Sequence, residues 1–232
     1  MKAMILAAGL GTRLKPFTDL HPKALFEVEG KTLLEHSLLH LKHAGIHEVI
    51  INVHHFAVQI IDFLRQHENF GLKITISDET GELLETGGGV KKAAWFFTGN
   101  ESAVIRNVDI LSDLDLLAME LFHRESHALA TLAVRDRQTS RYLLFDRSMQ
   151  LCGWENITTG ERKISRDAPL LSPFAFSGIQ VISPEIFSSV TEKGRFSLTG
   201  MYLRLAAGQK ILGYLDEGKI WKDVGRMTAN GG

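Results

Sequence analysis

Short apolar runs alternate with longer amphipathic segments in the first half of the chain, and this alternation limits the fold more than any other feature. Residues 3–8 and 48–53 are nearly continuous apolar runs, which are typical of strands buried on both faces. Between them, Thr32 and Glu35 have the spacing of a helix capping box, and leucines follow at helical intervals. Strands that alternate with helices in this way predict a mainly parallel sheet covered by helices on both faces.

The pattern changes after residue 128, where strands follow one another with turns between them instead of crossover helices. No Pro-, Gly- or Ser-rich linker separates the two halves, so the later strands are expected to extend the same sheet. We therefore predict one Rossmann-like α/β domain over residues 1–232, with a central mixed, mostly parallel sheet flanked by helices. The strands expected in the second half are residues 129–134, 142–145, 151–154, 174–182 and 210–215, and the expected helix is 198–207.

The composition excludes several classes of protein. Apolar residues make up 44% of the chain and charged residues 23%, which is ordinary for a globular protein and excludes a disordered one. Lys and Arg total 26 against 27 Asp and Glu, so the chain lacks the basic excess that coats nucleic acid or anionic lipid. The single cysteine, Cys152, cannot form an intrachain disulfide, and no run approaches the roughly 20 apolar residues of a membrane span. We expect a soluble, cytoplasmic protein with no nucleic-acid partner and no membrane partner.

The strongest local signal is the loop of residues 9–18, which follows the first strand and carries two glycines and an arginine. Such a loop suits an anion, because glycines let the backbone approach closely and its amides and the arginine attract negative charge. A dinucleotide fingerprint needs a third glycine where Leu14 stands and an acidic residue near His54. A Walker P-loop needs a glycine where Leu25 stands, with four residues between it and Gly30-Lys31-Thr32. Neither template fits, and the pattern Gly-x-Gly-Thr-Arg remains.

That pattern, followed by Pro22 and Lys23, resembles the signature of the sugar-1-phosphate nucleotidyltransferase family, Gly-x-Gly-Thr-Arg and then Pro-Lys-Pro. Ala24 stands where the family has its second proline, and Val108 stands where it has glycine. Further blocks follow in family order, so the resemblance covers essentially the whole chain. They are residues 84–89, the region of Asp109, residues 176–179 and residues 221–225.

Within the family, the short length and the sequence Leu-Glu-Thr-Gly-Gly-Gly look most like the N-acetylmuramate-1-phosphate uridylyltransferases of peptidoglycan recycling, which serve the cell wall. Mannose-1-phosphate and heptose-1-phosphate guanylyltransferases share the same blocks, and glucose-1-phosphate uridylyl- or thymidylyltransferases are a further alternative. The resemblance implies transfer of a nucleotidyl group from a nucleoside triphosphate to a sugar 1-phosphate, with release of pyrophosphate. It assigns residues 1–127 to the nucleotide and residues 128–232 to the sugar phosphate, in a monomer or a homodimer.

The resemblance also implies roles for individual residues. Arg13 is expected at the β- and γ-phosphates and Lys23 at the α-phosphate, as catalytic residues, because the reaction mainly requires neutralised charge and fixed geometry. Asp109 and Asp223 are the expected ligands of Mg²⁺, a hard ion that prefers oxygen. The expected nucleotide-binding residues are Ala7, Ala8, Gly9, Gly11, Thr12, Arg13, Lys23, Glu85, Thr86, Gly87, Gly88 and Asn107.

The base is expected between the end of the first strand and a glycine-rich turn over residues 82–89, where glycines let the backbone stack on it. The sugar is expected near Ser177 and Gly178, with Glu155 and Asn156 as additional candidates.

Two readings from other classes stay open. A phosphocholine cytidylyltransferase needs an aromatic cage for a quaternary ammonium group, for which Trp154 and Trp221 are candidates. A non-catalytic nucleotide-sugar sensor is expected to lack a metal carboxylate or the loop arginine, both of which are present here.

Three histidines at helical spacing, His36, His40 and His43, are expected on a solvated helix face.

Overall fold

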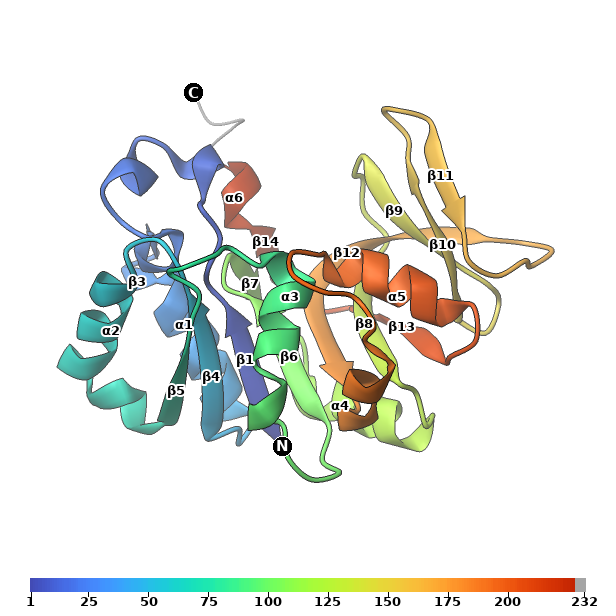
Figure 1. The fold of residues 1–232 in the computed structure, drawn as a ribbon. Helices are drawn as coiled ribbons and strands as arrows, with labels where there is room; N and C mark the ends of the chain where they lie inside the picture. Colours follow the sequence, from blue (N-terminus) through green and yellow to red (C-terminus); the bar gives the residue numbers. More distant parts are fainter. Residues whose placement is uncertain (228–232) are drawn as a thin grey trace.

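The computed structural model of the protein describes residues 1–227, and only the backbone of the last two (Figure 1). Among these residues, no helix combines the length and the apolar character that crossing a membrane requires. The helices are α1 (Leu33–His43), α2 (Ala57–Gln66), α3 (Glu85–Lys92), α4 (Leu116–Glu125), α5 (Leu198–Ala206) and α6 (Val224–Met227). The strands are β1 (Lys2–Leu6), β2 (Glu27–Val28), β3 (Lys31–Thr32), β4 (Glu48–Val53), β5 (Lys73–Asp78), β6 (Ala103–Asn107), β7 (Ile110–Ser112), β8 (Ala130–Arg135), β9 (Arg141–Phe145), β10 (Leu151–Asn156), β11 (Glu161–Ile164), β12 (Ser172–Ile182), β13 (Ile211–Leu215) and β14 (Trp221–Asp223).

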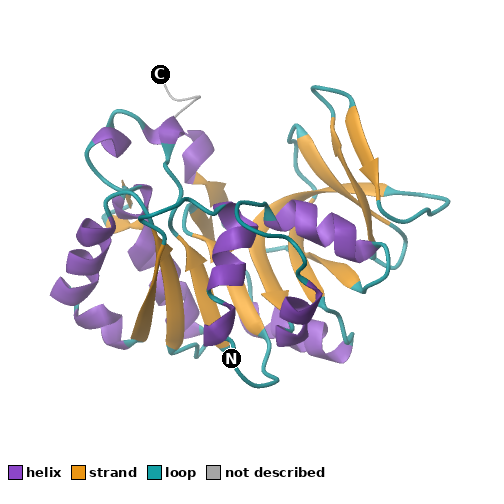
Figure 2. Ribbon diagram, viewed as in Figure 1, coloured by secondary structure: helices purple, strands orange, loops and turns teal. Residues whose placement is uncertain are grey.

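One mixed sheet of ten strands runs through the protein, in the order β11-β10-β9-β12-β6-β1-β4-β5, with β8 paired to β12 and β13 paired to β8. The strands β6, β1, β4 and β5 are parallel, whereas β12 runs antiparallel to β6 and carries the sheet into the second half. Figure 2 shows this single sheet with helices on both sides. The predicted mixed sheet flanked by helices is therefore confirmed. The short pairs β2–β3 and β7–β14, and the strand β11, are additions that the sequence analysis did not predict.

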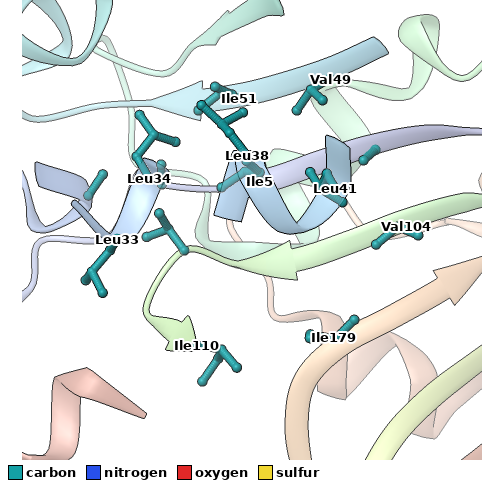
Figure 3. Close-up of a cluster of buried hydrophobic side chains, with 14 of the residues drawn as sticks. Ile5, Leu33, Leu34, Leu38, Leu41, Val49, Ile51, Val104, Ile110 and Ile179 are labelled. Atoms are coloured by element: carbon teal, nitrogen blue, oxygen red, sulfur yellow. The ribbon is translucent and has the colours of Figure 1, made fainter. Parts of the chain in front are cut away.

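Alternate residues of the central strands serve two separate cores, one on each face of the sheet. In β1, Ile5 faces the core under α1 and Met4 faces the core under α3 and α5. Figure 3 shows the first of these cores, where Leu34 and Leu38 of α1 meet Ile5. The helix begins as predicted, because the Thr32 hydroxyl oxygen accepts a hydrogen bond from the Glu35 amide at 3.1 Å.

The four parallel strands end at the same edge of the sheet, and the loops that follow them converge there. This edge is where open α/β sheets place their ligands. The loops that it gathers follow β1, β4, β5 and β6 and begin at Ala7, His54, Glu79 and Val108. The fold thus brings segments from across the first half of the chain to one place.

His40 is not on a solvated helix face, and the expectation for this histidine is wrong. Its Nε2 bonds to the carbonyl oxygen of Leu114 at 2.9 Å, and its Nδ1 lies 2.8 Å from a guanidinium nitrogen of Arg106. Because arginine only donates, Nδ1 accepts and the imidazole is neutral. Burial and the positive charge of Arg106 lower the pKa of His40 to about 4. Burial also lowers the pKa of Arg106 to about 10, against the opposing charge of Asp109.

His123 of α4 is a second buried histidine. Its ring nitrogens lie 2.9 Å from the Thr131 hydroxyl and 3.0 Å from the Ser183 hydroxyl, which hold the ring between β8 and the end of β12. Burial lowers the pKa of His123 to about 4.

These two histidines make the stability of the protein depend on pH. Their native pKa values of about 4 lie below the ordinary value of 6.5, so the unfolded chain takes up protons first as the pH falls through 6.5. We expect the free energy of unfolding, measured by urea titration, to decrease from pH 6.5 to pH 4. In His40→Gln and His123→Gln the slope should be shallower, by up to roughly one proton for each histidine removed.

The matched control is His43→Gln, which changes an exposed histidine of the same helix as His40. It should keep the slope of the unchanged protein. Equal slopes in all four proteins would contradict the assignment of this pH dependence to the buried pair.

Candidate functional site

The loop after β1 is shaped by Gly11, which has a left-handed backbone with φ of 62°. A β-carbon at this position would lie 2.8 Å from the β-carbon of Lys23 and 2.8 Å from the methyl group of Thr18. The loop therefore folds back on the segment that carries Lys23 only because residue 11 has no side chain. Gly9 differs, since a β-carbon there would meet no protein atom within 4 Å. The backbone of Gly9 is therefore accessible to a ligand in the site.

Lys23 crosses from this loop to the end of β6, where its ammonium group forms an ion pair with the carboxylate of Asp109. The two side chains are 13% and 10% exposed, so water screens their attraction only in part. Asp109 follows Asn107, the last residue of β6, by two positions. The pair thus links the glycine loop to the neighbouring strand of the sheet.

Asp223 joins this group through the pairing of β14 with β7. In that pairing Asp223 lies opposite Ile110, and the Val224 amide donates a hydrogen bond to the Asp109 carbonyl oxygen at 3.1 Å. A β-carbon at Gly225 would lie 3.1 Å from a carboxylate oxygen of Asp109 and 3.3 Å from one of Asp223. Two aspartates that are 114 positions apart in the chain therefore flank the same point.

Arg13 reaches the same point, because a β-carbon at Gly225 would also lie 3.2 Å from one of its guanidinium nitrogens. Two carboxylates and one guanidinium thus surround a residue that carries no side chain, and the Lys23 ammonium group pairs with the same carboxylate oxygen of Asp109. The carboxylates supply the oxygen ligands that a magnesium ion prefers, and Mg²⁺ is commonly held by one or two protein carboxylates. The residues present fit such an ion.

A first cavity of about 420 Å³ opens beside this cluster. It extends from the end of β1 to the segment before α3, and its walls include most of the residues expected to bind a nucleotide. The lining residues are Leu6, Ala8, Gly9, Arg13, Lys23, Asn52, Leu83, Glu85, Thr86, Asn107, Asp109 and Ser197. The other residues expected to bind a nucleotide are not among the lining residues; they are Ala7, Gly11, Thr12, Gly87 and Gly88.

Two glycines of α3 have a packing role that the sequence did not predict. The helix already begins at Glu85, so the predicted turn over residues 82–89 is wrong from residue 85 onward. A β-carbon at Gly87 would lie 2.4 Å from the ring of Phe196, and one at Gly88 would lie 2.6 Å from the Gly194 carbonyl oxygen. Both glycines let α3 pack closely on the segment that precedes α5. Their amides donate to the Phe196 carbonyl oxygen at 2.9 and 3.2 Å.

A buried polar network supports the wall formed by residues 83–86. The side chains that form it were not among those predicted from the sequence. The carboxylate of Glu79 accepts from the Asn52 side-chain amide at 2.8 Å and from the Leu84 backbone amide at 3.3 Å. The Asn52 side-chain oxygen accepts from the Ala7 amide at 2.8 Å. Asn52 and Glu79 are 2% and 1% exposed. The network therefore fixes one wall of the cavity relative to the end of β1. An asparagine within the apolar strand β4 is the sequence signal that could have indicated it.

A second cavity of about 460 Å³ is lined by Asp223 and adjoins the first. Asn107 and Ser197 line both cavities, whereas Asp109 lines the first and Asp223 the second. The walls of the second cavity come from β9–β12, β14 and the start of α5. The lining residues are Asn107, Ile110, Arg137, Thr139, Arg141, Tyr142, Leu143, Trp154, Lys163, Phe176, Gly178, Ser197, Thr199, Gly200, Leu203, Trp221 and Asp223.

The four residues expected at the sugar separate in the structure. Gly178 lines the second cavity at a bulge of β12, with φ of 81°, and a β-carbon there would lie 2.6 Å from Ile110. Ser177 is fully buried, and its carbonyl oxygen accepts a hydrogen bond from the Trp221 indole at 3.0 Å. Glu155 pairs with an arginine of β11, and Asn156 accepts from the Thr158 amide at 3.0 Å. Neither Glu155 nor Asn156 is among the residues that line the cavity.

The two residues that depart from the family pattern are both buried in the core. Ala24 and Val108 are 0% and 3% exposed, and both side chains belong to the core beneath α1. At neither position does the side chain stand in the cavities.

The whole chain matches known proteins. Residues 2–229 match the family model described as nucleotidyl transferase. N-acetylmuramate alpha-1-phosphate uridylyltransferases from Caulobacter vibrioides and Neisseria meningitidis are 35% and 31% identical to it, over 98% of this chain and 93% and 94% of theirs. A UTP–glucose-1-phosphate uridylyltransferase from Synechocystis is 28% identical over 98% of this chain and 61% of its own.

Solved structures share the fold at lower identity. A putative glucose-1-phosphate thymidylyltransferase from Bacillus anthracis superposes with a TM-score of 0.80 at 20% identity, over 97% of this chain and 90% of that one. A UDP-glucose pyrophosphorylase in complex with UDP-glucose gives a TM-score of 0.76 at 18% identity, over 97% and 93%.

The buried network makes a testable prediction. Glu79→Gln places an amide where two donors now find acceptors, and a buried donor left without an acceptor costs about 1–3 kcal/mol. We expect the free energy of unfolding to fall by that amount, and the wall at residues 83–86 to loosen relative to β1. The measurement is urea unfolding, together with binding of a nucleoside triphosphate by calorimetry.

Glu82→Gln is the control, because Glu82 is exposed and lies only three residues away. It should leave both quantities unchanged. If Glu79→Gln behaves like Glu82→Gln, the network does not support the wall.

Proposed function

We infer the activity of this protein from one premise, which is that the chain belongs to the nucleotidyl transferase family. Its relatives transfer nucleotidyl groups to sugar 1-phosphates, and the chain is an enzyme of that kind. For its own substrates we propose UTP and N-acetylmuramate 1-phosphate, with UDP-N-acetylmuramate and pyrophosphate as products. The observation that carries this assignment is the near full-length match to two enzymes of that name.

We propose that the triphosphate lies in the first cavity and the sugar phosphate in the second. In the reaction, a phosphate oxygen of the sugar 1-phosphate forms a bond to the α-phosphorus of UTP. The bond from that phosphorus to the bridging oxygen breaks, and pyrophosphate leaves in line. The arrangement of the two aspartates supports this placement, since they lie at the border of the two cavities, where the reacting atoms meet.

Both reactants are anions, so the protein contributes position and charge more than proton transfer. Arg13 is suited to the β- and γ-phosphates, because its planar guanidinium binds two oxygens at once. Lys23 is suited to the α-phosphate, where an ammonium group stabilises the charge that develops in the transition state. Its ion pair with Asp109 holds that group at the wall of the first cavity.

Asp109 and Asp223 would hold Mg²⁺, which neutralises phosphate charge and helps to orient the reacting groups. Among residues 1–225, no cluster of three or more His, Cys, Asp or Glu side chains is arranged to bind a metal. A site with two carboxylates is the kind that completes its coordination with phosphate oxygens and water.

The base has a place between Ala8 and Gly9 on one side and Glu85 and Thr86 on the other. Asn107 stands at the border to the second cavity, within reach of either substrate. Ala7, Gly11, Thr12, Gly87 and Gly88 contribute to nucleotide binding through the backbone conformation of the segments that carry them. Of the residues considered for the sugar, Gly178 keeps a direct role and Ser177 acts by holding Trp221.

The choline alternative finds no support in the second cavity. The faces of both candidate tryptophans already carry a cation of the protein. The Arg137 guanidinium lies 4.0 Å from the centre of the Trp221 ring, and the Lys163 ammonium group lies 5.7 Å from that of Trp154. Aromatic faces occupied in this way disfavour a quaternary ammonium ligand, because like charges repel.

A panel of substrates tests the proposed function. UTP, GTP, dTTP and CTP are each combined with the 1-phosphates of N-acetylmuramate, N-acetylglucosamine, glucose, mannose and heptose, and with phosphocholine, and pyrophosphate release is measured. The highest kcat/KM is expected for UTP with N-acetylmuramate 1-phosphate. A higher value for another pair would overturn the substrate assignment, and no release with any pair would favour the non-catalytic sensor.

Loss of either aspartate should abolish turnover while the fold remains. We expect Asp109→Asn and Asp223→Asn each to lower kcat/KM by at least about 100-fold, because each removes a charge that holds the cation opposite the phosphates. Asp167→Asn, at an exposed position, is the control. Circular dichroism checks the fold, and turnover near that of the control in both variants would contradict the metal assignment.

A further inference from the structure

The second cavity carries an excess of positive charge that a neutral sugar does not require. Its charged lining residues are Arg137, Arg141, Lys163 and Asp223. Asp223 stands at the end that faces Asp109 and belongs to the pair beside Gly225. Away from that end, every charged residue of the lining is a cation.

Arg137 belongs to the inner end of this cavity. Its guanidinium stacks on Trp221, two residues before Asp223, and donates to the Phe176 carbonyl oxygen at 3.0 Å. These contacts fix its position beside β14. An arginine held so close to Asp223 lies where the phosphate of the sugar must come.

Arg141 and Lys163 belong to the outer wall, which is formed by one face of the strands β9, β10 and β11. Trp154 of β10 lies opposite Leu143 on one side and Lys163 on the other. Arg141 precedes Leu143 by two residues and so lies on the same face of the sheet. In Figure 1 these strands project beyond β12, on the side of the sheet away from β5. The outer wall thus combines two cations with an apolar surface between them.

The two cations of the outer wall differ in what they already bind. Lys163 pairs with Glu161 at 3.0 Å, in a bridge whose side chains are 61% and 52% exposed. Arg141 is exposed, and no carboxylate among residues 1–225 forms an ion pair with its guanidinium. A guanidinium binds a carboxylate through two parallel hydrogen bonds, which gives both charge and geometry. Arg141 has this capacity available at the end of the cavity remote from the phosphate.

We propose that Arg141 determines specificity by binding a carboxylate carried on the sugar, with Lys163 adding a second positive charge and Trp154 covering the apolar part of the substituent. The substrate class is then an acidic sugar 1-phosphate, with one anionic group at each end of the second cavity. This inference rests on the proposed function, which places the phosphate of the sugar at the Asp223 end of the second cavity. It explains why this chain would select an acidic sugar. N-acetylmuramate 1-phosphate carries such a carboxylate on its lactyl ether.

The test compares sugar phosphates that differ in the carboxylate. One pair is N-acetylmuramate 1-phosphate and N-acetylglucosamine 1-phosphate, and the other is glucuronate 1-phosphate and glucose 1-phosphate. The kcat/KM values with UTP and the dissociation constants from calorimetry are measured for the unchanged protein and for Arg141→Met. The preference for the acidic member should fall by about 10- to 100-fold in the variant, mainly through KM and the dissociation constant. Arg141→Lys should keep part of the preference, because it keeps the charge but loses the paired hydrogen bonds.

Arg162→Met is the matched control. Arg162 neighbours Lys163 on β11, but it lies on the opposite face and pairs with Glu155 at 3.8 Å. This variant should keep the preference of the unchanged protein.

The outcomes separate the two proposals. If the unchanged protein prefers glucuronate over glucose 1-phosphate but does not use N-acetylmuramate 1-phosphate, the proposed substrate fails and the role of Arg141 is still tested by the variant. If the unchanged protein shows no preference for the acidic member of either pair, in turnover or in binding, the carboxylate site is overturned. An equal loss for acidic and neutral members in Arg141→Met also overturns it, because that result indicates a general or structural effect.

Discussion

The antiparallel pairing of β14 with β7 holds together the groups on which the site depends. It sets Asp223 opposite Ile110 and lets the Val224 amide bond to the carbonyl oxygen of Asp109. Two carboxylates so close repel each other unless cations are near, and here Lys23 and Arg13 lie beside them. Gly225 follows directly, and any side chain there would enter the space between these charged groups. A three-residue strand therefore decides whether the charged cluster exists.

The two halves of the sheet contribute different kinds of wall. The parallel strands end in loops at one edge, and these loops form the first cavity. The antiparallel strands of the second half extend the sheet sideways and present a face, with side chains in rows, to the second cavity. A phosphate suits loops rich in backbone amides and cations, whereas a sugar ring suits a broad wall with aromatic and charged side chains. Asn107 and Ser197 line both cavities and mark the border between them.

Beneath both cavities, buried polar groups are paired in ways that fix the site. Glu79 and Asn52 join the end of β1 to the segment before α3. Arg106 joins α1 to the start of β7 through His40 and the carbonyl oxygen of Ile110. Buried polar groups cost free energy unless they are satisfied, so each such pair strongly favours one arrangement of the elements that it joins. Rigid support of this kind suits a reaction that depends on position.

The sequence was sufficient for the parts of this protein that local chemistry specifies. The apolar runs predicted the strands, Thr32 and Glu35 predicted the start of α1, and the two glycines of residues 9–18 predicted a tight loop after the first strand. Each of these depends on residues near one another in the chain, where spacing alone reports geometry. The resemblance then supplied Asp109 and Asp223 as a pair, although their sequence positions say nothing about distance.

Tertiary structure decided the remainder. Gly87 and Gly88 of α3 make room for Phe196 and Gly194, which lie more than a hundred residues further along the chain. The contact of His40 with Arg106 and that of Asn52 with Glu79 depend on the arrangement of the folded sheet. Trp154 lines the second cavity, whereas its neighbours Glu155 and Asn156 do not. The physical reason is the same in each case. Which face of a strand or helix meets another element depends on strand order and register, and those are set by burial of the whole sheet rather than by any local pattern.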